Sequence, residues 1–101
     1  MIIYLKSRTK KYDAKAEYNK NDGKVVVFKG STISDTVSQG SFRSAKSVET
    51  LRKSGCVKNN KLVEDVSFKS ASSAANFVTG SSTNGKLAWK DENGTALKDL
   101  V

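Results

Sequence analysis

The stretch Phe68–Leu100, FKSASSAANFVTGSSTNGKLAWKDENGTALKDL, carries the clearest signals for the fold of this chain. Ser70 is a good helix N-cap, and Gly80 is placed to end the same helix. Between them, one face of small side chains is formed by Ala71, Ala74, Ala75 and Val78. Because small side chains allow close approach, we expect this helix to lie tightly against a sheet.

Two strands are predicted after this helix. Leu87 and Trp89 alternate with polar neighbours, which is the period of a half-buried strand over residues 86–90. Asn93-Gly94 is a strong signal for a two-residue hairpin turn, and Thr95–Leu100 is expected to return as the partner strand. Since Trp89 is in phase with Leu87, we expect its indole in the core, with stacking on a ligand as the alternative.

The first thirty residues alternate between strand and turn signals. A short apolar run covers Ile2–Leu5, and residues 14–18 alternate as a half-buried strand does. Asp22-Gly23 marks a hairpin. Val25–Phe28 is apolar throughout, as expected for a central strand covered on both faces.

The middle of the chain has weaker signals. Residues 31–43 are rich in Ser, Thr and Gly and predict a long loop. A helix then follows over residues 44–54, capped by Ser44 or Ser47, and Gly55 ends it in a left-handed conformation. Asn59-Asn60 turns the chain into a weaker strand over residues 62–68.

Strands dominate this pattern, and the two helices fall between them. We therefore predict an α+β fold, a mostly antiparallel sheet with both helices packed on one face. The 101 residues fit a single domain, 1–101. No apolar run approaches the ~20 residues of a membrane span, and the single cysteine suits a reducing compartment. We expect a cytoplasmic monomer.

The positive charge is distributed unevenly along the chain. The sequence has 18 basic and 10 acidic residues, a net charge of +8. Residues 1–29 carry +5, residues 30–60 carry +3 and residues 61–101 carry none. This asymmetry favours an acidic partner, nucleic acid first and an anionic surface second. The alternative is that the lysines serve solubility alone.

The chain resembles a family known as the domain of unknown function 4357, over about residues 12–100. The residues that carry the resemblance are Asp13-Ala14-Lys15-Ala16, Val26 to Ser31, Leu51-Arg52 with Gly55, Phe68 to Ala75, Gly80, Asn84-Gly85 and Trp89-Lys90. Members of that family look like accessory modules, often C-terminal to GIY-YIG nuclease domains or attached to restriction-modification proteins. The resemblance implies a setting in bacterial DNA restriction or processing, and no known chemistry.

Catalysis and metal binding have little support in the sequence. Histidine, the commonest acid–base residue near neutral pH, is absent. Cys56 has no evident base to activate it, and between Gly55 and Val57 it is expected to be a small core residue. One cysteine and scattered carboxylates do not form a zinc site. We expect a protein that is not an enzyme and has no catalytic residues, metal or cofactor.

Two candidate binding sites lie around the second predicted helix. Its start presents unpaired N–H groups and a positive dipole end, which suit a phosphate, with Lys69, Ser70 and Ser72 around it. The loop that follows Gly80 offers Ser82, Asn84 and Lys86 to phosphates or base edges. In the alternative interpretation, Ser70 only caps its helix, and Asn84-Gly85 only supplies positive φ to a turn.

A third candidate site is electrostatic. Lysine and arginine neutralise phosphates without reading sequence, and aromatic side chains among them can stack on unpaired bases. The alternative is a solvated strand edge that is charged to prevent aggregation. The bases concerned are Lys6, Arg8, Lys10, Lys11 and Lys15, with Tyr4 and Tyr12 interleaved.

The leading hypothesis is a non-catalytic DNA-binding module that assists a nuclease or DNA methyltransferase, in cis or in trans. The rival is a protein-interaction or structural module that positions a partner enzyme without touching nucleic acid. The two differ in salt dependence, because phosphate binding weakens steeply with ionic strength and an apolar docking face does not.

Overall fold

The computed structural model describes residues 1–7, 12–34, 51, 53–80 and 83–100. Its main sheet is antiparallel throughout and has the strand order β1–β2–β3–β6. These strands are β1 (Ile2–Lys6), β2 (Asp13–Tyr18), β3 (Val25–Val27) and β6 (Val66–Phe68). A second, two-stranded sheet pairs β4 (Val57–Lys58) with β5 (Lys61–Leu62). Three helical segments follow, α2 (Ala71–Thr79), α3 (Gly85–Ala88) and the 3-10 turn η1 (Leu97–Asp99).

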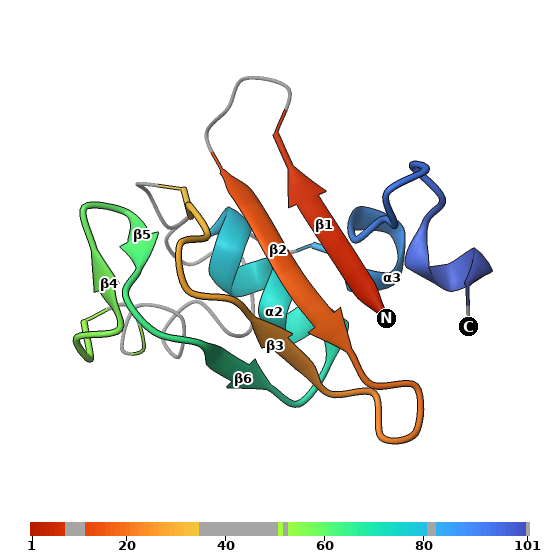
Figure 1. Ribbon diagram of the computed structural model, residues 1–101, viewed down its shortest axis with the longest axis horizontal. Helices are drawn as coiled ribbons and strands as arrows, with labels where there is room; N and C mark the ends of the chain where they lie inside the picture. The colour runs from red at the N-terminus through yellow and green to blue at the C-terminus, as the bar shows by residue number, and fades with distance from the viewer. Residues whose placement is uncertain (8–11, 35–50, 52, 81–82, 101) are drawn as a thin grey trace.

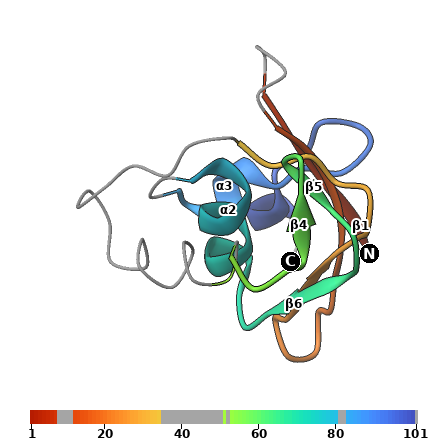
Figure 2. The same cartoon turned by 90° about the vertical axis from the view of Figure 1, so that its left-hand side faces the viewer.

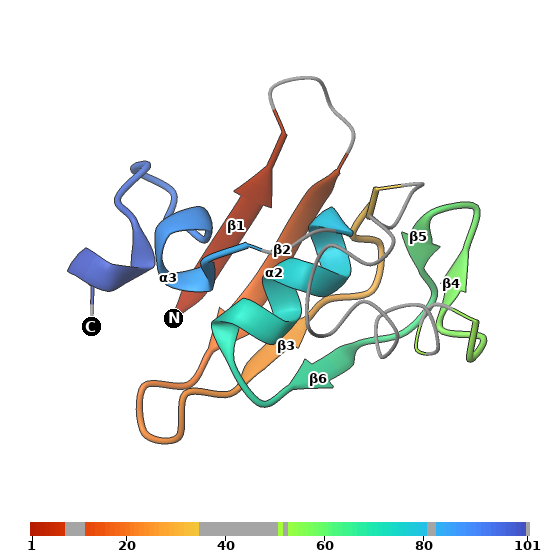
Figure 3. The same ribbon diagram turned by 180° about the vertical axis from the view of Figure 1, so that it is seen from behind.

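The molecule has two layers, a sheet and a helical layer. Both α2 and α3 lie behind the main sheet in Figure 1 and in front of it in Figure 3. Figure 2 shows the strands nearly edge-on with the helices to one side. The predicted α+β fold, a mostly antiparallel sheet with helices packed on one face, is therefore confirmed. Among the described residues, the other face of the sheet, called the outer face below, carries no helix.

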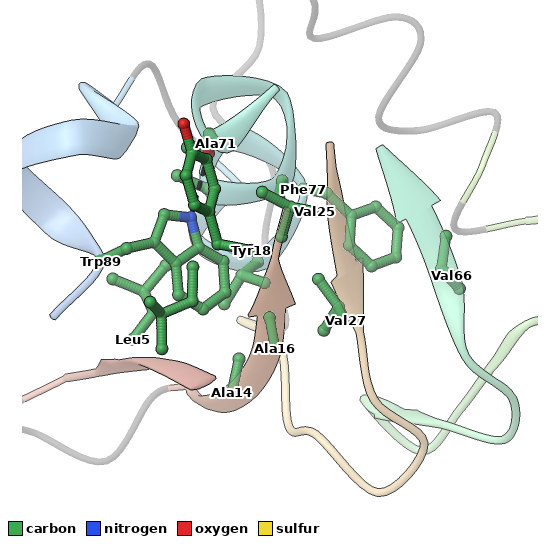
Figure 4. Close-up of a cluster of buried hydrophobic side chains, with 14 of the residues drawn as sticks. Leu5, Ala14, Ala16, Tyr18, Val25, Val27, Val66, Ala71, Phe77 and Trp89 are labelled. Atoms are coloured by element: carbon green, nitrogen blue, oxygen red, sulfur yellow. Dashed lines mark hydrogen bonds between the residues drawn. The ribbon is translucent and has the colours of Figure 1, made fainter. Parts of the chain in front are cut away.

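The core fills the space between the sheet and α2. Alternate residues of β1, β2 and β3 point inward, and the buried pattern of β2 is strictly alternating. Leu5 and Trp89 lie at one end of this layer, and Phe77 and Val66 lie at the other (Figure 4). The Phe77 ring meets the Phe68 ring with centroids 5.1 Å apart, a favourable tilted arrangement.

Several sequence predictions are confirmed in detail. Ser70 caps α2 by accepting a hydrogen bond from the Ser73 N–H at 3.1 Å, and Gly80 ends the helix with φ of 74°. Gly55 has φ of 99°. Asn59 and Asn60 both have positive φ, as the turn between β4 and β5 requires.

The segment after α2 is where the sequence interpretation is wrong. Residues 86–90 do not form a strand, because Gly85–Ala88 is a helical turn and Lys90 makes only isolated bridges. Lysine, leucine and alanine favour helix, and Asn84 caps the turn by accepting from the Lys86 N–H at 3.1 Å. Leu87 and Trp89 therefore point in different directions, with exposures of 49% and 0%. Trp89 is in the core as expected.

The predicted hairpin at Asn93-Gly94 is also wrong. The turn is wider than two residues, since the Asp91 N–H donates to the Thr95 carbonyl and Lys90 bridges Ala96. The Asp91 carboxylate accepts from the backbone N–H groups of Asn93 and Thr95, which holds this wider loop. Residues 97–99 then form η1 instead of a strand.

Three further predictions need adjustment. The strand predicted over residues 62–68 is divided between β5 and β6. β3 is an interior strand, but Val26 on its outer face is only half-buried, so that face is not covered as predicted. Most of the helix predicted over residues 44–54, with its N-cap candidates Ser44 and Ser47, and most of the loop predicted over 31–43 lie outside the described residues.

Candidate nucleic-acid interface

A row of four side chains crosses the outer face of the sheet. Tyr4 of β1 is directly opposite Lys15 of β2. On its other side Tyr4 forms a bridge with Lys90, exchanging both backbone hydrogen bonds, at 2.6 and 2.9 Å. Phe28 continues the β2–β3 register by donating its N–H to the Lys15 carbonyl at 2.9 Å. Directly opposite residues share a face, so the order across the sheet is Lys90, Tyr4, Lys15, Phe28, called the cation–aromatic row below.

The Phe28 end of the row is fixed by a tight turn. The Ser31 N–H donates to the Phe28 carbonyl at 3.2 Å, and Gly30 has φ of 90°, as at the third position of a type II turn. The turn buries Ser31, whose hydroxyl accepts from the Lys15 N–H at 3.1 Å and lies 3.3 Å from the Lys15 carbonyl. The Gly30-Ser31 pair thus holds the backbone of Lys15 and Phe28 together.

Tyr4 and Phe28 are aromatic side chains outside the core formed by the described residues. Both are half-buried, and neither is among the described side chains that form the core cluster or pack against it. The Lys6 ammonium lies over the Tyr4 ring, 5.5 Å from its centroid. An exposed contact of this kind is worth ~0.5–1 kcal/mol, less than the ~1–3 kcal/mol of a base stacked on an aromatic ring. A base can therefore displace Lys6 from the ring at a net gain.

Two grooves flank the row. One, of about 480 Å³, is lined by Tyr4, Lys6, Ala88, Lys90, Asp91, Glu92 and Gly94. The other, of about 430 Å³, is lined by Asp13, Lys15, Phe28, Lys29, Gly30, Ser31, Thr32 and Lys61. Each groove contains one aromatic ring of the row and at least two lysines. Lys15 stands between the two rings.

The charge of this face is mixed but positive. Five lysines line the two grooves, against three carboxylates. Glu17 adds a fourth carboxylate on the outer face, opposite Ile2. Arg8, Lys10 and Lys11 lie in the chain between Lys6 and Tyr12, outside the described residues. A phosphate backbone can therefore meet several cations here, whereas the acids limit how closely it can follow the whole face.

The start of α2 has a different character. Ser70 is used as the N-cap, and the Ser72 hydroxyl accepts from the Gly85 N–H at 3.1 Å. Gly85 is buried directly over the first turn of α2: a Cβ added there would lie 2.2 Å from the Ala71 carbonyl carbon and 2.3 Å from the Ser72 nitrogen. α3 thus occupies space over this helix start that a phosphate would need.

Trp89 completes the same junction. Its indole N–H donates to the Ala71 carbonyl at 3.0 Å, and the ring is fully buried. Ser72, Gly85 and Trp89 therefore form a structural junction that joins α3 to α2. Gly85 is needed because the two backbones approach closely there. The sequence interpretation in which Asn84-Gly85 supplies positive φ to a turn does not apply, since Asn84 has φ of −76° and Gly85 has no positive φ.

The sequence-predicted site residues therefore fall into separate groups. Lys6 and Lys15 lie together on the outer face. The Lys6 ammonium is 5.5 Å from the centroid of the Tyr4 ring, and Lys15 is directly opposite Tyr4 in the sheet. Lys69, Ser70, Ser72, Asn84 and Lys86 lie around α2 and α3, where Lys69, Ser72, Asn84 and Lys86 are exposed. Arg8, Lys10, Lys11 and Ser82 lie outside the described residues.

Sequence reasoning missed Lys90 and Phe28 as members of the row. Lys90 was assigned to a strand of the wrong hairpin, and only its bridge to Tyr4 brings it to this face. Phe28 was assigned to a strand covered on both faces. The signal that points to it is its place after Val27 in the alternating pattern, which puts it on the same face as Val26.

Within the described ranges, no group of three or more His, Cys, Asp or Glu side chains is placed to hold a metal ion. In the same part of the chain, no helix has the length and apolar character needed to cross a membrane.

Comparison with known proteins gives one match. No curated protein and no solved structure matches the chain. The family model described as "Domain of unknown function (DUF4357)" matches residues 3–101, which extends the resemblance over β1. The match covers the residues of the α2–α3 junction and those of the cation–aromatic row alike. The chain belongs to the DUF4357 family.

Proposed function

We propose that the outer face of the sheet binds nucleic acid without catalysis, and that its natural partner is DNA. The cation–aromatic row carries this proposal. Neither ring belongs to the core cluster of the described residues, and nucleic acid offers phosphates for the lysines and bases for the rings. The net charge of +8 favours the same class of partner.

The domain would then serve as an accessory module of a nuclease or DNA methyltransferase, in cis or in trans. The helical side supports this division of roles, because the Ser70 hydroxyl is used as the N-cap of α2 and the Ser72 hydroxyl accepts from the Gly85 N–H. Lysines on the outer face would anchor the phosphate backbone, and the partner enzyme would carry out the chemistry. The support for the partner class is the resemblance to accessory modules in restriction and DNA processing.

Charge-neutralising pairs test which side of the molecule binds. Lys15→Gln with Lys90→Gln removes two cations from the row, and Lys69→Gln with Lys86→Gln removes two from the helical side. Both double variants keep the same net charge, two units below +8. Fluorescence anisotropy of a labelled duplex DNA, titrated between about 50 and 200 mM salt, measures affinity and its salt slope.

We expect the sheet-side pair to weaken binding at every salt concentration. If four lysines neutralise phosphates, the affinity of the unaltered chain falls about 150-fold over this salt range. The sheet-side pair should reduce the slope of log K against log salt by about two units. The helical pair should leave most of that slope unchanged. An equal or larger loss from the helical pair would place the site at α2 and α3. No binding of this duplex or of a labelled single strand at 50 mM salt would favour the protein-interaction module.

A further inference from the structure

We infer that the cation–aromatic row is a stacking platform for unpaired nucleotides, so that the ligand is a single strand and not a duplex. This inference rests on the proposed function and names the substrate class of the same site. It depends on the spacing of the two rings. It also depends on the position of the lysines around them.

The rings are too far apart for neighbouring bases of a duplex. Tyr4 and Phe28 are on β1 and on the extension of β3, with β2 between them. Adjacent strands are about 4.8 Å apart, so the backbone positions that carry the two rings are about 10 Å apart. Bases in a duplex are stacked about 3.4 Å apart and have no free face. Only a strand whose bases are separated from each other can place one base on each ring.

The lysines complete the site for such a strand. Lys15 lies between the two rings in the row, where the backbone joining two separated bases must pass. Lys6 is 5.5 Å from the Tyr4 ring centroid and Lys90 is on the far side of Tyr4. Lys29 and Lys61 line the groove that contains Phe28. Each base position therefore has cations beside it, as in surfaces that bind single strands without reading sequence.

Aromatic variants separate this inference from the proposed function. Tyr4→Leu and Phe28→Leu keep an apolar side chain of similar bulk and remove the π-face. Val26→Leu is the matched control, since Val26 is a half-buried residue of the same face without a ring. The probes are labelled dT10, labelled U10 and a 12-base-pair duplex, measured by anisotropy at 50 mM salt. Thermal unfolding checks that each variant is folded.

We expect the unaltered chain to bind a single strand more tightly than the duplex. Tyr4→Leu and Phe28→Leu should each weaken single-strand binding about ten-fold and leave duplex binding unchanged. Val26→Leu should change neither. Binding of dT10 or of U10 through the rings supports the inference, whichever of the two binds more tightly.

The duplex could bind as tightly as the single strand or more tightly, with neither aromatic variant changing its affinity. That result would overturn the stacking platform and leave the proposed function standing. Failure of all three probes to bind at 50 mM salt would overturn both. A ten-fold loss from Val26→Leu as well would show that the variants act by disturbing the sheet, and would also contradict the inference.

Discussion

At the scale of single residues, Gly85 has little room for a side chain. Gly85 does not have a positive φ, so backbone conformation is not the reason for a glycine there. The reason is steric, because the backbone of Ala71 and Ser72 lies where a side chain would be. Gly94 is its opposite, with φ of 83° and no atom within 4 Å of the place that a Cβ would take. The two glycines are thus required for different physical reasons, steric contact and backbone conformation.

Gly85→Ala should therefore be much more damaging than Gly94→Ala. Relieving a backbone clash needs α3 to move away from α2, which we expect to cost about 3 kcal/mol, the upper part of the range for overpacking. A left-handed alanine at position 94 costs about 1 kcal/mol. Thermal unfolding should show a melting temperature lower by more than about 10 °C for Gly85→Ala and by about half that or less for Gly94→Ala. Equal losses would contradict the close contact at Gly85.

At the scale of elements, the start of α2 illustrates how one residue can suit two interpretations. Ser70 fits a phosphate site and a helix cap equally well in the sequence. In the structure it caps the helix, and Gly85 lies over the same turn. We therefore expect the contribution of Ser70 to be one of stability.

Ser70→Ala should lower the free energy of unfolding by about 1 kcal/mol and leave the affinity for dT10 unchanged. Ser70→Asn is the control, because asparagine caps as well as serine and should restore stability. Denaturant unfolding and anisotropy measure the two effects. A loss of affinity in Ser70→Ala, at a temperature where the variant is fully folded, would assign α2 to the binding site.

The elements also show how far the sequence could predict the structure. Local signals succeeded where one residue sets the local conformation, as Ser70, Gly80 and Gly55 do. They failed over residues 84–100, because Asn84 can cap a helical turn as readily as it can form a loop. The alternation of Leu87 and Trp89 was real as a pattern, but Trp89 follows the end of α3 and is buried by tertiary contact with Ala71.

The candidate site was predictable only in part for the same reason. Lys6 and Lys15 lie on strands whose alternating pattern can be recognised, so their common face follows from the sequence. Lys90 comes to Tyr4 through a single bridge between segments 86 residues apart, which no local pattern contains. Phe28 follows Val27 in the alternating pattern, which places it on the outer face, and the turn at Gly30-Ser31 fixes it there.

At the scale of the whole molecule, we propose that the two faces have different roles. The helical side is joined by hydrogen bonds and close backbone contact, and the outer face of the sheet carries lysines and two rings that the core does not use. This division is the central claim of the account. It predicts that binding leaves the α2–α3 junction unchanged.

Chemical-shift mapping by NMR is the measurement that tests this claim most directly. An isotope-labelled sample titrated with dT10 at low salt should shift the amide signals of β1, β2, Phe28 and Lys90, and the ring signals of Tyr4 and Phe28. The signals of Ser72 and Gly85 should stay in place. Shifts centred on Ser70, Ser72 and Gly85, with Tyr4 and Lys15 unaffected, would contradict the assignment of the outer face as the nucleic-acid interface.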